Sequence, residues 1–235
     1  ERFWEAHDLI VKAWTSHDGP FNWEGKYFHH RQVNIWPRPY QEPHPPIWIT
    51  ALSPSGARDV GERGYVVACF LTGFEGTRTV FGEYRGRRDE LKLPTAALDR
   101  FAYAALVYVG GTDEEGHAGA RKLMWYLESN KVPPQFTSPP GYHPTASTVN
   151  AMKGANPGIF KMFQNPALGP LMDAGLVFAG NPDSVYRQIM KMYEHVGGFG
   201  HLLIMGQAGF LDHDETVKGM RMFVREVYPR LKELA

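Results

Sequence analysis

The stretch PIWITALSPSGARDVGERG, residues 46–64, decides the fold class. It begins with a short apolar run, 47–50, which is typical of a buried β-strand. A Ser-Pro-Ser-Gly turn follows and leads into a helix expected over 54–63, with Ser53 as its N-cap, Pro54 as its first residue and a glycine at its end. The stretch therefore predicts a strand–helix unit with a turn at the amino end of the helix.

The same strand-then-helix order recurs along the chain. Further strands are expected over 66–70, 101–109 and 202–205, and helices are expected over 77–92, from Thr112 to about Asn130, from Pro182 to Val196 and after Asp212. Repeated β-then-α order implies parallel strands joined by crossover helices. About four strands are half of the eight in a TIM barrel. Two alternatives stay open: an open, doubly wound sheet, or the second half of a (β/α)₈ barrel.

Residues before this alternation have a different character. An amphipathic helix is expected over 2–15 and an aromatic hairpin over 21–28, and residues 37–46 contain five prolines. Proline has no backbone donor, so 37–46 is expected to be an extended connector rather than a helix or a central strand.

A second segment, 131–180, interrupts the alternation and is rich in proline and glycine. A connection of this length in a compact domain is usually a lid or a binding loop. Tyr142 and His143 are the candidates in it for closing over a substrate. A surface loop without such a role is the alternative.

Charge and cysteine content narrow the functional class. Lys plus Arg and Asp plus Glu are both 25, so the net charge is zero, and we expect neither a nucleic-acid nor a membrane-surface partner. No apolar run reaches ~18 residues, so no transmembrane helix is expected. Cys69, the single cysteine, is expected to be a buried core thiol, and a cytoplasmic protein is the default expectation.

Several catalytic motifs are absent from the sequence. It contains no G-x-S-x-G, G-x-G-x-x-G, Walker A, H-E-x-x-H or C-x-x-C pattern, which removes the usual support for hydrolase, Rossmann and P-loop functions. His29, His30 and His44 do not have the spacing of zinc ligands, so we expect no metal site.

The turn at 53–56 suggests an anion site. Backbone N–H groups at the amino end of a helix point outward, where the helix dipole also favours negative charge, and a phosphate fits there. Ser53 and Ser55 add hydroxyl donors, and Gly56 allows a close approach of the backbone. The alternative is that Ser53 serves only as the N-cap.

Several stretches together resemble one family. They are Arg2–Ala6, Phe21–Phe28, Trp36–Gln41 with Pro43–Pro46, Ile47–Pro54, Gly180–Val185, Gly206–Gln207 and Glu226–Leu231. In this combination the chain resembles the bacterial luciferase-like flavin-dependent monooxygenases. The resemblance covers nearly the whole chain but only the later part of the family's sequence.

This resemblance implies a single barrel domain over 1–235 that lacks the N-terminal strands of the barrel. It also implies an oxidoreductase that uses reduced FMN and O₂ on a small organic substrate, a possible flavin reductase partner and a homodimer. Related members use a deazaflavin for hydride transfer. A non-catalytic flavin-binding or structural remnant of such a barrel is the other alternative.

The resemblance also names site residues. Ser53 corresponds to the phosphate ligand, Leu52 and Gly56 offer backbone N–H groups, and Gln207 follows the last strand, where it can contact cofactor or substrate. Ala51-Leu52 stands where the family frequently has Gly-Ser, so one hydroxyl donor is missing. In this family the catalytic residues belong to the earlier strands. The resemblance therefore assigns no catalytic residue in this chain.

Overall fold

The computed structural model describes residues 1–129 and 166–234. The chain divides into two compact units, Glu1–Ile47 and Trp48–Ala235. Tyr142 and His143, the predicted lid residues, lie outside the described residues.

The first unit contains the predicted helix and a hairpin whose second strand lies beyond the predicted range 21–28. Helix α1 spans Arg2–Thr15, and strands β1 (Phe21–Glu24) and β2 (His29–Val33) pair antiparallel. The Glu5 carboxylate holds the hairpin turn, because it accepts hydrogen bonds from the backbone N–H groups of Lys26, Tyr27 and Phe28 at 3.0, 3.0 and 2.9 Å. One helix side chain thus fixes the turn.

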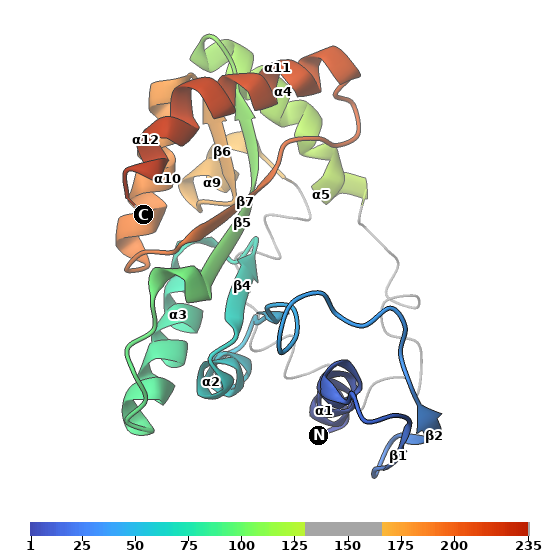
Figure 1. The fold of residues 1–235 in the computed structure, drawn as a ribbon. Helices are drawn as coiled ribbons and strands as arrows, with labels where there is room; N and C mark the ends of the chain where they lie inside the picture. Colours follow the sequence, from blue (N-terminus) through green and yellow to red (C-terminus); the bar gives the residue numbers. More distant parts are fainter. Residues whose placement is uncertain (130–165, 235) are drawn as a thin grey trace, which may run out of the picture. The chain divides into compact units, whose positions relative to one another are not determined.

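The second unit is built on a parallel sheet (Figure 1). Its strands are β3 (Trp48–Thr50), β4 (Val66–Phe70), β5 (Phe101–Val109), β6 (Val177–Gly180) and β7 (His201–Met205). All four pairings are parallel, in the order β3-β4-β5-β6, with β7 also paired to β5.

Strand β5 is shared by three neighbours. Ala102 pairs with both Ala68 of β4 and His201 of β7, while Leu106 pairs with both Val177 of β6 and Met205 of β7. Since β7 occupies one edge, β4 and β6 share the other edge end to end. The sheet is therefore a β3-β4-β5-β7 layer, with β6 continuing the line of β4 along the far half of β5.

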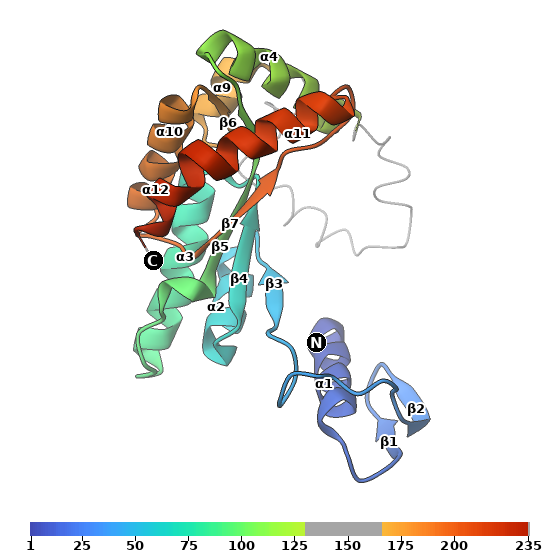
Figure 2. The same cartoon turned by 45° about the horizontal axis from the view of Figure 1, so that its top comes forward.

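Helices pack against this sheet. They are α2 (Pro54–Arg63), α3 (Gly73–Glu90), α4 (Asp113–Leu123), α5 (Trp125–Ser129), α9 (Leu168–Asp173), α10 (Pro182–His195), α11 (His213–Met222) and α12 (Tyr228–Lys232), with a 3₁₀ turn η1 (Leu98–Arg100) and a π-helical turn η2 (Phe223–Val227). In Figure 2, α3 and α10 lie on the same side of the sheet. No helix in the described part of the chain is long and apolar enough to cross a membrane.

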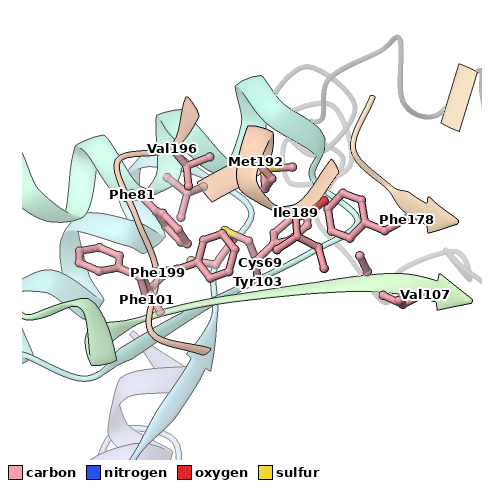
Figure 3. Packing of buried hydrophobic residues seen from close by; sticks show 14 of the residues in the cluster. Cys69, Phe81, Phe101, Tyr103, Val107, Phe178, Ile189, Met192, Val196 and Phe199 are labelled. Atoms are coloured by element: carbon pink, nitrogen blue, oxygen red, sulfur yellow. The ribbon is translucent and has the colours of Figure 1, made fainter. Parts of the chain in front are cut away.

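The larger core cluster fills the space between the sheet and the layer of α2, α3 and α10. Phe101 and Tyr103 of β5 are fully buried there against Phe81 of α3 and Met192 of α10 (Figure 3). A second cluster packs Leu106 and Tyr108, from the opposite face of β5, against α4 and α9. Alternate residues of one strand thus face two separate cores.

The sheet is strongly curved. Trp48 of β3 and His201 of β7 have ring centroids only 4.6 Å apart, although two strands separate them. In a flat sheet three strand spacings would place these strands about 14 Å apart. The curvature is that of a barrel wall, the second of the two alternatives that the sequence left open.

One strand was missed by the sequence analysis, and the count of about four core strands was wrong. Residues 168–180, which were assigned to the predicted lid, form helix α9 and the buried strand β6. The strand has only four residues, all buried, so its apolar run has no alternation to distinguish it. The helix expected over 77–92 also begins earlier, at Gly73.

The N-terminal caps of α4 and α11 differ. Asp212 and Glu215 form a full capping box, with hydrogen bonds of 2.8 and 3.2 Å. Thr112 accepts from the Glu115 N–H at 3.2 Å, but the Glu115 carboxylate accepts from the Gly111 N–H at 2.7 Å rather than returning to Thr112. The second box is therefore half formed, because its carboxylate has another partner.

Arg85 joins α3 to the end of α10, and its removal should destabilise the fold. Its guanidinium donates to the carbonyls of Val196, Gly197 and Gly198 at 2.9, 2.9 and 3.2 Å and lies 4.2 Å from the Phe101 ring centroid. Arg85→Ala should lower the free energy of unfolding by about 2 kcal/mol, measured by urea denaturation, because hydrogen bonds to a charged donor at a helix C-terminus are lost.

The matched control for this measurement is Arg78→Ala on the same helix. The Arg78 side chain is 64% exposed and its ion pair with Glu75 is 3.9 Å long. This variant should stay within about 0.5 kcal/mol of the parent protein. Equal effects of the two substitutions would show that the α3–α10 link is not stabilising.

Candidate functional site

The candidate site is the turn between β3 and α2. Ser53 has extended backbone angles and is the N-cap, as predicted, and its Oγ accepts a hydrogen bond from the Gly56 N–H at 3.2 Å. The Ser53 carbonyl accepts from the Ala57 N–H at 3.0 Å, which starts the helical ladder. Pro54 needs no donor at the first helical position.

This turn presents polar groups to solvent. Leu52, Ser53 and Ser55 are exposed, and the two serine Oγ atoms lie 3.4 Å apart. Within the described residues, the backbone N–H groups of Leu52 and Ser55 have no hydrogen-bond partner. A hydroxyl that accepts from Gly56 keeps its own proton to donate. Ser53 can therefore cap the helix and bind an anion at the same time, so the two interpretations of the sequence do not exclude each other.

Gly56 keeps the turn compact. A Cβ at this position would lie 3.2 Å from the Ser53 Oγ, which is closer than ordinary van der Waals contact. A larger residue would therefore crowd the hydroxyl that caps the helix. Sequence analysis placed Leu52, Ser53 and Gly56 at one site, and the structure brings these three residues together in one turn.

The turn is held from beneath by the sheet and the core. The Ala51 N–H donates to the Ala68 carbonyl at 3.1 Å, which extends the β3–β4 pairing by one residue. Below it the buried Cys69 thiol lies 3.8 Å from the Ala51 carbonyl, and Ala57 and Val60 anchor the first turns of α2 in the core. The exposed groups of the turn thus rest on a rigid support.

Two charged side chains of α2, Arg58 and Glu62, are directed to α3. Arg58 pairs with Glu90 at 2.5 Å and Glu83 at 3.4 Å, and Arg87 pairs with Glu62 at 2.7 Å. The hydrogen bond to Glu90 raises the pKa of Arg58. Because Arg58 is committed to the α2–α3 contact, the turn offers hydroxyls and backbone N–H groups to a ligand rather than this guanidinium.

Gln207 lies at the same end of the sheet on a different strand. It is exposed and directly follows the buried Gly206 after β7, while Ala208 and Leu211 fix the loop in the second core cluster. The carboxyl ends of parallel strands share one edge, where barrel enzymes carry their active sites. No hydrogen bond joins Gln207 to the Ser53 turn among the described residues.

Exposed aromatic residues occur at this end of the sheet, and the sequence analysis did not assign them to a site. Phe210 follows Gln207 in the same loop, and its side chain is 68% exposed. The sequence shows only an aromatic residue in a glycine-containing loop, and its exposure depends on the packing around it.

In the described ranges, 1–129 and 166–234, no three potential metal ligands come together.

Comparison with known proteins gives the family. Residues 1–198 match the model of the luciferase-like monooxygenases. The chain belongs to this family. An uncharacterised protein, y4wF of Sinorhizobium fredii, is 35% identical over 68 residues, which are 29% of this chain and 19% of that protein.

Solved structures of similar fold confirm the partial TIM barrel. The monooxygenase RslO1 from Streptomyces bottropensis has a TM-score of 0.69 at 19% identity. The oxygenating constituent of 3,6-diketocamphane monooxygenase from Pseudomonas putida, solved with FMN, has a TM-score of 0.66 at 20% identity. The coenzyme F420-dependent tetrahydromethanopterin reductase of Methanopyrus kandleri has a TM-score of 0.64 at 16% identity.

These structures are longer than this chain. The similarity covers 98%, 96% and 97% of the chain but 61%, 62% and 62% of RslO1, the diketocamphane enzyme and the reductase. The chain therefore spans about three fifths of the length of each, which is consistent with a partial barrel.

Cys69 should be chemically inert in the folded luciferase-like chain. Burial raises the pKa of its thiol to about 12, against a lowering contribution from a hydrogen bond with Thr72. The thiolate is then about one part in 10⁴ at pH 8. Ellman's reagent should not react with the native protein and should label one thiol per chain in urea. Fast labelling of the native protein would contradict the buried position.

Proposed function

We propose that this chain is the phosphate-binding part of a flavin-dependent monooxygenase that uses reduced FMN and O₂ on a small organic substrate. The observation that carries the proposal is the exposed Ser53 turn at the carboxyl end of β3. Family membership supports an oxidoreductase, and the FMN bound by the similar diketocamphane enzyme supports this cofactor.

The residues present fit a phosphate group. The turn combines the Ser53 and Ser55 hydroxyls with the N–H groups of Leu52 and Ser55 at the positive end of α2. Helix N-termini of this kind bind phosphate because donors and dipole act together. Gly56 contributes by leaving the Ser53 hydroxyl uncrowded.

Each residue has a binding or orienting role in this proposal. Reduced FMN, when bound, supplies the reaction with O₂, while the protein positions it and selects the substrate. The Ser53 and Ser55 hydroxyls hold the phosphate and thereby fix the distal end of the cofactor. Gln207, a neutral donor and acceptor at the same end of the sheet, contacts cofactor or substrate.

A deazaflavin-dependent hydride transfer is the second candidate. It is favoured by the similarity in fold to the F420-dependent reductase and to an F420-dependent secondary alcohol dehydrogenase, at TM-scores of 0.64 each. A flavin reductase partner and a homodimer belong to the monooxygenase proposal. A non-catalytic remnant that retains only the phosphate turn is the remaining alternative, and it would bind FMN without turnover.

Ser53→Asp separates phosphate binding from helix capping. Aspartate is as good an N-cap as serine, so the free energy of unfolding should stay within about 0.5 kcal/mol. Its negative charge should repel the phosphate and weaken FMN binding at least about tenfold, measured by flavin fluorescence quenching, since a charged hydrogen bond contributes about 1.5–3 kcal/mol.

Riboflavin, which lacks the phosphate, is the matched ligand for this experiment. Its affinity should be the same for the parent protein and for Ser53→Asp. Ser53→Ala should weaken FMN binding and also lower stability by about 1 kcal/mol, because the cap is lost. Equal FMN affinity of Ser53→Asp and the parent protein would exclude Ser53 as the phosphate ligand.

A further inference from the structure

Four aromatic side chains gather near the carboxyl end of the sheet. Phe70 is the last residue of β4, Trp125 and Tyr126 begin α5, and Phe210 lies in the loop after β7. The ring centroids of Phe70 and Tyr126 are 6.2 Å apart and those of Trp125 and Phe210 are 6.0 Å apart, both in edge-to-face geometry. We call these four residues the aromatic wall.

The loop after β7 is built to hold Phe210 outward. Ala208 and Leu211 are buried in the second core cluster, and the Leu211 N–H donates to the Ala208 carbonyl at 3.1 Å. Between these two anchors Phe210 stays 68% exposed. Phe210 is therefore exposed because buried residues on both sides of it fix the geometry of the loop.

Gly209 fixes the indole of Trp125. This glycine has φ +44°, and a Cβ on it would lie 2.6 Å from the Trp125 ring atom Cδ2. The indole therefore lies directly against the glycine backbone, and no larger residue fits between them. With Phe210 against its ring as well, Trp125 still keeps 39% of its surface exposed.

The surroundings of the wall favour a neutral ligand. The two lysines that link α4 and α11 are already paired, Lys122 with Glu215 and Lys218 with Glu115. Gln207, three residues before Phe210, is exposed and offers an uncharged donor and acceptor. Adjacent large aromatic side chains in contact with water mark a binding surface.

We propose that the aromatic wall selects the substrate, and that this substrate is a neutral aromatic compound with a hydroxyl or carbonyl substituent. The aromatic ring packs on the exposed surfaces of Trp125 and Phe210, and Gln207 hydrogen-bonds the substituent. The assignment rests on the proposed function, because Phe70 and Phe210 of the wall, like the Ser53 turn, lie at carboxyl ends of the parallel strands, where a barrel enzyme binds its ligands.

The probe for this site is 2-naphthol, and its affinity for the full 235-residue chain is measured by equilibrium dialysis. Phe210→Leu keeps an apolar side chain but removes the ring, so 2-naphthol affinity should fall about three- to tenfold, the range expected for one aromatic pair. Trp125→Leu should weaken binding at least as much. Circular dichroism checks that both variants fold. Because Phe210 is exposed, Phe210→Leu should perturb the fold less than Trp125→Leu does.

Tyr228→Leu is the matched control, because Tyr228 is an exposed aromatic residue of the same unit (47%) and begins α12, which carries none of the four wall residues. It should leave 2-naphthol affinity unchanged. Decahydro-2-naphthol, the saturated analogue with the same hydroxyl, should bind at least about threefold more weakly than 2-naphthol to the parent protein. Equal binding of the two compounds would overturn the aromatic assignment.

Measuring FMN separately distinguishes the two proposals. Phe210→Leu should leave FMN affinity within about twofold, whereas Ser53→Asp should leave 2-naphthol affinity unchanged. Unchanged 2-naphthol binding in Phe210→Leu and Trp125→Leu would overturn the aromatic wall and leave the phosphate site standing. If Ser53→Asp leaves FMN affinity unchanged while Phe210→Leu and Trp125→Leu weaken 2-naphthol binding, the flavin proposal is overturned and the aromatic wall stands.

Discussion

The backbone pairing of β5 is the constraint on which the second unit depends. This nine-residue strand pairs with β4 and β6 along one edge and with β7 along the other. Its alternate side chains also fill both core clusters, with Tyr103 in one and Leu106 in the other. Because all pairings are parallel, the carboxyl ends of the strands lie together, and the loops that follow them share one end of the sheet.

The position of the candidate site follows from this arrangement. Short pairings such as β3–β4 fix where β3 stops, and the turn after it has to reverse direction before α2 packs on the core. The backbone groups at that reversal cannot pair within the helix, so they stay exposed unless a side chain or ligand meets them. The Ser53 hydroxyl accepts from one of them, the Gly56 N–H, and under the proposed function the N–H groups of Leu52 and Ser55 bind the phosphate.

The Ser53 turn and the loop that carries Phe210 both place exposed groups on a buried support. Below the Ser53 turn lie Cys69 and the buried first turns of α2, and below Phe210 lie Ala208 and Leu211. Binding residues that are held in place lose little conformational freedom when a ligand arrives. The two proposals place substrate selection and cofactor binding on separate loops, so each loop can vary without disturbing the other.

The sequence by itself determined the β-then-α order apart from α9 and β6, and it placed the Ser53 cap, because these depend on local periodicity and on residues close together in the chain. It missed β6, whose four buried residues carry no alternation. The curvature shown by Trp48 and His201, and the contact of Trp125 with Phe210, join residues far apart in sequence. Such contacts arise only from packing of the whole unit, so only the tertiary structure decided them.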